Sequence, residues 1–476
     1  MLQQTLLTDS DCEQIRDAVL RTLERVGMMI QNAQLREALE RAGARVDHAA
    51  ERAWFPPALV TGVLEALRAA HPAPAEAPRR VAPGLPTLGV QVAQFYLDWA
   101  KRERRPGNRQ DFLTMIRLGD VIAAGDVGHA LLMTDVPPLL EPLEAVALLC
   151  EHARRPGYTY PHHVEQFEYL AEIGEIWEGR RDRFLIGGVF LTSPLRLCRR
   201  AADFLAWRVS RGMECGLGTM ACVGASVPVT LAGAITVTAA EVIGTWVAMK
   251  ALRPETPVGV GLACGSVDMR SGNASYCSPE AMLLNFGTRE FLQRVSGVTA
   301  GISGADDYCD AKFPGLAAAM EKALKAMTIA AYTGIQPGVG EGMLESGKTL
   351  SPEQLLIERE VTEHVRRLAQ PLSVSPETLA LEAIEEVGFG AQTTYLNCEH
   401  TLRHFREALW HPRLLDRTVW HEFAAEAQGE TKLVERAHQQ FQELLAAYQP
   451  PQPDPEKLKA IRAVIDQAKR NLQAVP

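Results

Sequence analysis

The apolar and polar positions of the central chain alternate between two periods. Short apolar, β-branched or glycine-rich runs are each followed by a longer segment with apolar residues at helical spacing. The eight runs that predict strands are residues 87–91, 129–135, 157–161, 183–190, 214–221, 256–264, 297–304 and 335–342. Alternation of this kind is typical of stacked βα units. It predicts an α/β fold, and eight such units closing on themselves predict a (β/α)8 TIM barrel, with an open doubly wound sheet as the alternative.

Two proline-rich breaks divide the chain, "HPAPAEAPRR" at 71–80 and "YQPPQPDPEK" at 448–457. Proline excludes helix and favours extended backbone, so both read as linkers. Before the first break, Thr8 is placed to cap a helix. The predicted organisation is therefore a helical N-terminal extension over 1–80, the barrel over 81–385, and a C-terminal helical cover and tail over 386–476.

The composition narrows the class of protein. The chain of 476 residues is 47% apolar, carries a formal net charge of −9 and has no long basic run, which argues against a nucleic-acid surface. Its nine cysteines contain no C-x-x-C pair, a usage typical of free thiols in a reducing cytoplasm. The apolar segment 227–249 is interrupted by Pro228 and Glu241 and reads as core. We expect a cytoplasmic protein without a membrane span.

One loop concentrates acids. In "SGADDYCDAKFPG", residues 303–315, Asp306, Asp307 and Asp310 form a D-D-x-x-D pattern of the kind that binds metal diphosphates. The loop follows the seventh predicted strand and lacks a second acidic set and a basic cluster, which disfavours that reading. Asp306 and Asp307 also fit a helix cap, so Asp310, with its neighbour Tyr308, is the better candidate.

Other loops at the same predicted mouth add acids and aromatic rings. Together these side chains suit an organic cation, which is attracted to carboxylates and to ring faces. The predicted substrate-binding set is Tyr160, Asp268, Arg270, Tyr308, Asp310 and Glu341. No residue is predicted as catalytic. The sequence has no P-loop, no G-x-S-x-G and no H-E-x-x-H motif.

Zinc is the second possibility for the mouth. Cys215, Cys222, Cys264 and Cys309 all fall near predicted strand ends, and thiolates from separate strands can form a catalytic zinc site. Buried free cysteine is the commoner state, and no paired spacing supports a metal. We therefore predict that the isolated chain holds no stoichiometric metal, and keep a zinc-thiolate site as the alternative.

The C-terminal stretch "GFGAQTTYLNCEHTLRHFREALWHPRLLDR", residues 388–417, resembles the trimethylamine methyltransferase family in its Y-L, H-T, R-x-E, W-x-P and D-R positions. "SVPVTLAGAITVTAAE" at 226–241, "VDMRSG" at 267–272 and "SPEQLLIERE" at 351–360 are similar to segments of the same family. The chain departs from the usual family sequence at "PGLAA", residues 314–318.

The resemblance implies a TIM barrel that moves a methyl group from a methylated amine to the cobalt of a small corrinoid protein. Only standard residues occur, so the chain is similar to the branch without pyrrolysine, whose substrates are quaternary amines such as glycine betaine. The corrinoid (cobalamin) is then supplied by a cognate partner protein and none is covalently bound. A quaternary nitrogen leaves as a neutral amine, so the enzyme needs only to orient it and exclude water. A betaine-binding barrel without turnover remains an alternative, and a homo-oligomer is left open.

The helix predicted within this C-terminal stretch carries the predicted corrinoid-facing residues. Its apolar residues recur at helical spacing and leave His400, Arg403 and His404 on the polar side. Arginine and histidine donate hydrogen bonds to amide and phosphate oxygens and lie flat against ring systems. We expect this helix to cover part of the barrel mouth.

Overall fold

The computed structural model describes residues 5–72, 84–122, 125–302, 308–335, 338–368, 370, 372–390, 393–419 and 429–472. The helices are α1 Asp9–Arg25, α2 Ala33–Arg41, α3 Pro57–Ala70, α4 Arg109–Ile122, α5 Glu141–His152, α6 Phe167–Glu178, α7 Arg199–Ser210, α8 Leu231–Leu252, α9 Pro279–Ser296, α10 Leu316–Thr333, α11 Pro352–Leu368, α12 Pro376–Leu379, α13 Leu381–Val387, α14 Glu399–Ala408, α16 Gly429–Ala446 and α17 Pro455–Leu472, with 3-10 turns η1 Val164–Gln166 and η2 Tyr395–Asn397. The strands are β1 Met28–Ile30, β2 Arg45–Asp47, β3 Arg52–Trp54, β4 Phe95–Asp98, β5 Glu103–Pro106, β6 Gly188–Phe190, β7 Arg196–Leu197, β8 Gly216–Thr219, β9 Cys222–Val223, β10 Val260–Leu262, β11 Gly265–Val267, β12 Ala274–Ser275, β13 Gly301–Ile302, β14 Met343–Leu344 and β15 Thr349–Leu350.

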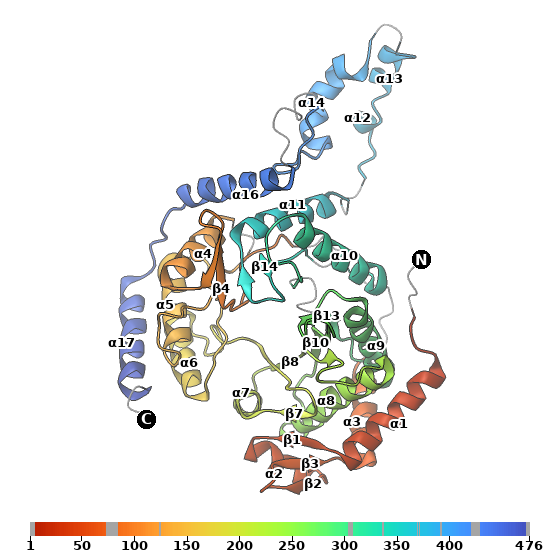
Figure 1. Ribbon diagram of the computed structural model, residues 1–476, viewed down its shortest axis with the longest axis vertical. Coiled ribbons are helices and arrows are strands. Elements are labelled where there is room, and N and C mark those ends of the chain that lie inside the picture. Colours follow the sequence, from red (N-terminus) through yellow and green to blue (C-terminus); the bar gives the residue numbers. More distant parts are fainter. Residues whose placement is uncertain are drawn as a thin grey trace.

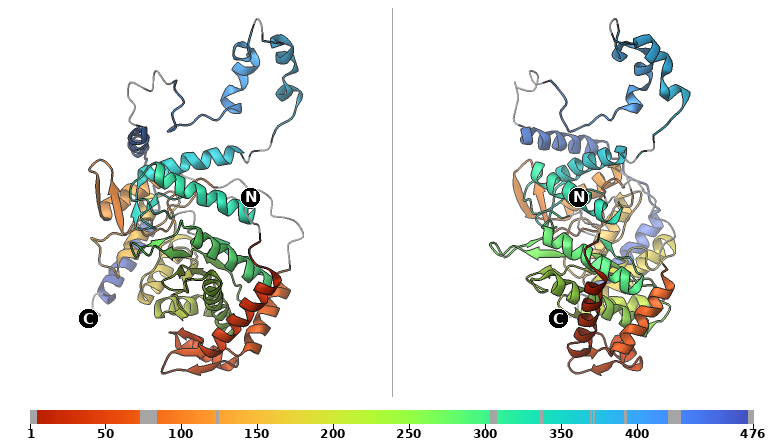
Figure 2. Two further views of the ribbon diagram at one scale, coloured as in Figure 1. Left: turned by 45° about the vertical axis from the view of Figure 1, so that its right-hand side comes forward. Right: turned by 90° about the vertical axis from the view of Figure 1, so that its right-hand side faces the viewer.

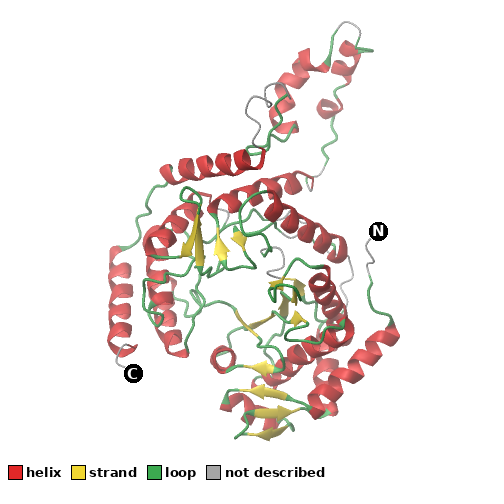
Figure 3. Cartoon of the chain, viewed as in Figure 1, coloured by secondary structure: helices red, strands yellow, loops and turns green. Residues whose placement is uncertain are grey.

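Helices α4 to α11 form the outside of a ring whose inner side carries short strands (Figure 1, Figure 3). The helices predicted from apolar spacing between strands, α5 to α11, are confirmed. Their ends follow local signals: Ser278 accepts a hydrogen bond from the Ala281 amide at the start of α9, and Gly297 ends that helix with a left-handed φ of 74°. Helix α4 and the hairpin β4–β5 were not predicted.

One stretch of the ring is a regular parallel sheet in the order β6, β8, β10, β13. These four strands lie within four of the eight predicted runs, so those predictions are confirmed. A separate three-stranded sheet follows two of these strands in the chain: β9 runs parallel to β11, and β11 turns back as a hairpin with β12.

The other predicted strands pair only through isolated bridges. The Gly128 amide donates to the Leu88 carbonyl at 2.8 Å, and Val127 and Thr159 form parallel bridges with Pro156 and Leu185. Backbone hydrogen bonds therefore link neighbours from the first predicted strand to the seventh. Within the described chain no ladder joins residues 338–342 to either neighbour, so the structure shows an α/β ring of parallel segments without demonstrating a closed barrel.

The N-terminal segment, predicted to be helical, also contains a small sheet. Strands β2, β3 and β1 pair in that order, and β1 then pairs in parallel with β7 of the ring. Thr8 caps α1 as predicted, accepting from the Asp11 amide while the Asp11 carboxylate accepts from Thr8. The helical prediction missed these strands because three-residue strands give too short an alternation to detect.

The last part of the chain leaves the ring and returns to it. Helices α12, α13 and α14 lie on an arm that projects away from the ring, and α16 and α17 then pack against its outside (Figure 1, Figure 2). Helix α16 contacts α11 and α4, whereas α17 contacts α5 and α6. Helix α17 begins within the second proline-rich break and takes up the described part of the chain that follows it.

Helix α8 is the most buried helix of the core between the sheet and the outer helices. Among the described residues it is the one helix that is long and apolar enough to cross a membrane, and 72% of its apolar window is buried inside the protein. By itself this is weak evidence for a span, because core helices pass the same test. Trp246 near its centre is fully buried, as expected for core.

Candidate functional site

The inner face of the parallel sheet is lined by glycine. Side chains of Val189, Leu217 and Leu262 pack into the core under the outer helices. Because successive residues of a strand point to opposite faces, the residues between them point toward the middle of the ring. Those inner positions are Gly188, Gly216, Gly218, Gly261 and Gly301, which we call the glycine wall.

Register aligns the glycine wall across four strands. Gly188 pairs with Gly216, Gly218 pairs with Gly261, and Gly261 pairs with Gly301. A Cβ on Gly301 would meet no heavy atom closer than the Val260 carbonyl oxygen at 3.8 Å, and both Gly216 and Gly301 are exposed. The wall therefore leaves room on the inner face that side chains would otherwise fill.

Aromatic rings lie beside the glycine wall. Phe190 of β6 pairs with Gly218, and a Cβ on Gly218 would meet the Phe190 ring at 2.6 Å, so the ring lies over that glycine. Phe190 is 37% exposed and Tyr158 is 42% exposed, although both belong to the ring interior. Tyr158 and Tyr160 share one face of the third segment because Thr159 between them is buried on the other face. Three rings from neighbouring strands thus border the same space.

Glu341 brings a carboxylate to this face. A Cβ on Gly89 would lie 3.6 Å from a Glu341 carboxylate oxygen and 3.4 Å from the Gln91 amide nitrogen, which places both side chains beside the first segment. Burial raises the pKa of Tyr158, and the nearby charge of Glu341 raises it further. Glu341 and Tyr158 therefore interact across the inner face, and an organic cation between them would meet a negative charge and a ring face.

A basic group stands next to Tyr160. The Arg200 guanidinium carbon lies 5.3 Å from the Tyr160 ring centroid, at the first turn of α7. No side chain caps this helix, so its first amides point toward the same region. Burial raises the pKa of Tyr160, and the charge of Arg200 opposes that rise. This corner is suited to an anionic group.

A buried network orients the third segment. His129 contacts the Thr159 hydroxyl at 2.7 Å and the Glu141 carboxylate at 2.9 Å, and the Met133 amide donates to the same oxygen at 3.0 Å. Burial alone would raise the pKa of Glu141, but His129 and the Met133 amide together lower it below its ordinary value. Because Thr159 is held from behind, Tyr158 and Tyr160 are directed to the inner face.

The acidic loop acts as a connector in the structure. The Ser275 hydroxyl donates to Asp310 at 2.5 Å and the Ser346 hydroxyl at 3.5 Å, so the carboxylate joins the loops that follow the sixth and eighth segments. Tyr308 packs edge to face on Tyr276, with ring centroids 5.1 Å apart. Asp310 therefore already has hydrogen-bond donors from the protein itself. Asp306 and Asp307 lie outside the described residues.

Two predicted site residues are not on the inner face. Asp268 and Arg270 are exposed in the turn of the β11–β12 hairpin. The Asp268 carboxylate accepts from the Ser271 hydroxyl at 2.7 Å and from the Arg270 amide at 3.1 Å. A short acidic residue that bonds backbone amides two residues later is typical of a turn. The hairpin carries both side chains away from the inner face, and their role as substrate contacts stays a prediction.

The predicted corrinoid-facing residues lie on the arm. Arg403 pairs with Glu399 at 3.3 Å and His404 with Glu377 at 3.3 Å. The apolar side of α14 is exposed instead of buried, with Leu402 72% exposed, whereas His400 and His404 are half-buried against each other with ring centroids 4.6 Å apart. In this structure α14 projects away from the ring instead of covering its mouth (Figure 2), and a corrinoid-facing role of these residues stays a prediction.

The four candidate zinc cysteines are poor ligands in this structure. Burial raises the pKa of Cys215 to about 12 and of Cys309 to about 11, and it raises the pKa of Cys222 and Cys264 as well. Within the described ranges, no group of three or more His, Cys, Asp or Glu side chains is placed to hold a metal ion. The zinc alternative has no ligand set among these residues.

Comparison with known proteins gives a consistent picture. A family described as "Trimethylamine methyltransferase (MTTB)" matches residues 2–473. Trimethylamine methyltransferase MttB2 of Methanosarcina mazei is 30% identical over 339 residues, which is 71% of this chain and 66% of that protein, just under two thirds of its length. Glycine betaine methyltransferase of Desulfitobacterium hafniense is 24% identical over 480 residues, covering 97% of this chain and 96% of that protein. The crystal structure of the Methanosarcina barkeri monomethylamine methyltransferase MtmB aligns with a TM-score of 0.43 and 12% identity, over 92% of this chain and 94% of that one.

Sequence patterns found part of this site and missed part. Tyr160 and Glu341 were predicted, and the structure puts both at the ring interior. Phe190 and Arg200 were missed, although Phe190 ends the fourth predicted strand and Arg200 begins the helix after it, near the end of a barrel strand where functional groups are found. The glycine wall was visible only as scattered glycines, because its alignment depends on the register between strands.

Proposed function

Since the chain belongs to the trimethylamine methyltransferase family, we propose that it transfers a methyl group from a quaternary amine, glycine betaine or a related betaine, to a corrinoid carried by a partner protein. The observation that carries the proposal is the inner face of the ring, where three aromatic rings and a carboxylate border a wall of register-aligned glycines. We further propose that the parallel segments close as a (β/α)8 barrel around this face. The near full-length similarity to a glycine betaine methyltransferase supports the choice of amine.

The quaternary ammonium would lie between Glu341 and the rings of Tyr158 and Phe190. A quaternary nitrogen has no proton to donate, so it cannot form hydrogen bonds, and its attraction to ring faces and to a carboxylate is electrostatic. The tyrosine phenols stay protonated because burial raises the pKa of both Tyr158 and Tyr160. The rings thus present neutral faces to the cation, and only Glu341 balances its charge.

Arg200 would bind the carboxylate of a betaine. It lies against Tyr160, at the corner where the uncapped first turn of α7 also favours negative charge. Cation and anion sites on neighbouring elements fit the two ends of a zwitterion. Trimethylamine, which is protonated near neutral pH, offers only the cationic end, which is why the arrangement favours a betaine over trimethylamine.

The glycine wall allows the reacting methyl group to be approached. When bound, the partner's corrinoid would supply the reduced cobalt that accepts the methyl group. What this chain contributes is orientation of the ammonium and exclusion of water, since the departing tertiary amine is neutral and needs no general acid. None of the described residues is assigned to the corrinoid, because His400, Arg403 and His404 lie on the arm.

We also propose that the partner is a cognate corrinoid protein and that the protein is cytoplasmic. A zinc-thiolate methyltransferase is disfavoured by the protonated, dispersed cysteines. A betaine-binding protein without turnover has the same inner face, and a turnover assay separates the two.

The test is demethylation of a panel of amines by the purified chain with reduced cobalamin, followed by methylcobalamin absorbance. We expect turnover with glycine betaine or another betaine and much less with trimethylamine. The contrary result is binding of betaines in calorimetry with no formation of methylcobalamin, whether free cobalamin or a corrinoid protein from the same source is added. That result would favour the betaine-binding protein over the enzyme.

The variant Arg200→Met tests whether Arg200 binds the carboxylate of a zwitterionic substrate. The variant should lose at least tenfold in kcat/KM for betaines and little for choline or tetramethylammonium, which have no carboxylate. Arg199→Met is the matched control, because Arg199 is the neighbouring exposed arginine and pairs with Glu51 of the N-terminal segment at 2.5 Å. Equal losses in both variants, or equal losses for all amines, would remove Arg200 from the site.

A further inference from the structure

Helix α10 has its charged side toward the protein and its apolar side toward solvent. Lys322 and Lys325 are buried, Lys322 in an ion pair with Glu358 and Lys325 bonded to the Tyr308 carbonyl at 2.6 Å. Four apolar side chains on the opposite face are each 62% to 64% exposed: Leu316, Met320, Leu324 and Met327. A surface helix normally has the reverse arrangement.

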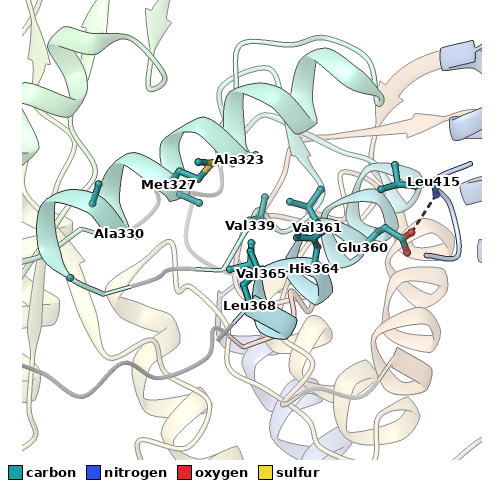
Figure 4. A pocket seen from close by; sticks show the side chains of 13 residues that line it. Ala323, Met327, Ala330, Val339, Glu360, Val361, His364, Val365, Leu368 and Leu415 are labelled. Carbon is teal, nitrogen blue, oxygen red and sulfur yellow. Dashed lines mark hydrogen bonds between the residues drawn. The ribbon is translucent and has the colours of Figure 1, made fainter. Parts of the chain in front are cut away.

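Beside this exposed face runs a groove of about 700 Å³ between α10 and α11. Figure 4 shows Ala323, Met327 and Ala330 of α10 facing Val361 and Val365 of α11 across it. Its wall is almost wholly aliphatic, and the described charged residues of α10 all bind inward. The groove is therefore suited to an apolar helix, and it lies outside the ring, away from the glycine wall.

The arm, which we define as residues 372–390 and 393–419, also exposes apolar side chains to solvent. Five of its leucines are each more than half exposed: Leu372, Leu379, Leu381, Leu396 and Leu402. Only Ala383, Val387, Cys398 and Leu414 are buried within it. A segment of this size with so few buried side chains has no hydrophobic core of its own. Burial of its apolar side chains against another protein surface would therefore stabilise it.

The arm starts beside the groove yet points away from it. Helix α11, whose last residue Leu368 lines the groove, ends immediately before the arm, and Figures 1 and 2 show the arm directed away from the ring. The returning end of the arm touches the edge of the groove, where Leu415 lines it and its amide donates to Glu360 at 3.3 Å, but α12 and α13 do not cover the groove of their own chain. Two copies can cover both the groove and these helices at once if each arm seats in the other copy's groove, the reciprocal contact of a two-fold dimer.

Charge supports a second copy as the occupant. Helices α12 and α13 carry Glu377, Glu382, Glu385 and Glu386 and no Lys or Arg. The last turn of α11, at the end of the groove, carries Arg366 and Arg367. The acidic, apolar segment formed by α12 and α13 therefore matches a groove that is mostly apolar along its length and basic at its end.

We propose that the chain forms a dimer by exchanging arms, with α12 and α13 of each copy seated between α10 and α11 of the other. This inference is independent of the proposed methyl transfer, because neither surface includes a residue of the inner face.

Native mass spectrometry and light scattering of the full chain test the dimer and its surfaces. Wild-type protein should be dimeric at micromolar concentration. Met327→Glu in the groove and Leu381→Glu on the arm should each raise the dimer dissociation constant at least tenfold, and Leu324→Glu and Leu379→Glu serve as second variants if one of the first pair fails to fold. Val26→Glu, at an exposed apolar position of the N-terminal segment, is the matched control and should stay dimeric.

Mixing the two single variants gives the sharper result. A Met327→Glu copy has an intact arm and a Leu381→Glu copy has an intact groove, so one junction survives in the mixed dimer but none in a chain carrying both substitutions. The mixture should therefore recover dimer, and the double variant should not. A monomeric wild type, loss of dimer with only one surface, or no recovery on mixing would overturn the proposal. A monomer whose variants lose only their response to a corrinoid protein would assign the groove to that partner instead.

Discussion

The two halves of the ring are built by different means. In the half formed by β6, β8, β10 and β13, a continuous parallel ladder holds the backbone, and the inner positions need no side chains. The other half has only isolated backbone bridges, and buried polar side chains on the outer side fix the positions of its segments. These segments are residues 87–91, 127–133, 156–160 and 338–342. The first half supplies space, and most of the charged and phenolic groups come from the second. Backbone hydrogen bonds free a strand to carry glycine, whereas segments without them must be fixed by their side chains.

The buried acids differ between the halves in the same way. Glu141 and Glu358, in the second half, face the basic side chains of His129 and Lys322. Glu241, beneath the first half on α8, accepts hydrogen bonds from the Ser193 hydroxyl and the Leu195 amide, each at 2.7 Å, and both of these donors are neutral. A buried acid with a basic partner and one without such a partner should therefore affect the free energy of unfolding in different ways.

The largest expected effect is on the second half. Lys322→Met leaves the Glu358 carboxylate, which also accepts from the Gly342 amide at 2.6 Å, buried without its cation. Breaking a buried pair in this way costs about 3–5 kcal/mol of unfolding free energy. Urea unfolding should show this loss and a partial recovery in Lys322→Met/Glu358→Gln. A loss below about 1 kcal/mol would mean that the pair does not hold the eighth segment.

The next effect concerns Glu241 and pH. Burial raises its pKa from 4.5 to about 7. Between these values the folded state keeps a proton that the unfolded chain releases, so stability falls as pH rises through this window, by about 3 kcal/mol at most, and is level above it. Glu241→Gln, which cannot ionise, should flatten the dependence between pH 5 and pH 8 measured by urea unfolding. Parallel curves for both proteins would show that Glu241 ionises normally.

Filling the glycine wall should destroy activity while sparing the fold. Gly301→Leu places a side chain where a Cβ meets nothing closer than 3.8 Å, so the sheet should tolerate it. It would occupy the space proposed for the amine, and we expect kcat/KM to fall about 100-fold or more, roughly 3 kcal/mol in the transition state, with little change in Tm.

Gly259→Leu is the control for that variant. Gly259 precedes β10, two residues before Gly261 on the same face, and a Cβ there also meets nothing within 4 Å. Because it lies nearer the amino end of the strand, away from the mouth, its effect should stay below tenfold, roughly 1.4 kcal/mol. Equal losses at both positions would mean that the wall has no localised site.

The smallest predicted effect is removal of one charge from the second half. Glu341→Gln keeps the shape but takes away the carboxylate beside Tyr158, so KM for a betaine should rise about tenfold, roughly 1.4 kcal/mol, with kcat little changed. The pKa of Tyr158 should fall in the same variant, because Glu341 helps to raise it. Asp268→Asn, in the exposed hairpin, should leave both quantities unaltered. If Asp268→Asn raised KM and Glu341→Gln did not, the hairpin would be the binding element.

The sequence by itself determined the elements that depend on local pattern. Helices α5 to α11 follow from apolar spacing, and the four runs that became regular strands are rich in glycine and β-branched residues. The family resemblance also stood on the sequence alone, and the family match over residues 2–473 confirms it. Tyr160 and Glu341 could be predicted as site residues because each lies near the end of a predicted strand.

Only the tertiary structure decided which side chains meet. Asp310 carried the strongest sequence signal, yet loops distant in the chain bring Ser275 and Ser346 to its carboxylate. Asp268 and Arg270 were drawn outward by a hairpin whose pairing is set by strand register, and α14 took a direction that its own periodicity cannot specify. The glycine wall has the same origin. A glycine in one strand says only that a side chain is missing, and it is the register of β8, β10 and β13 that puts Gly218, Gly261 and Gly301 side by side.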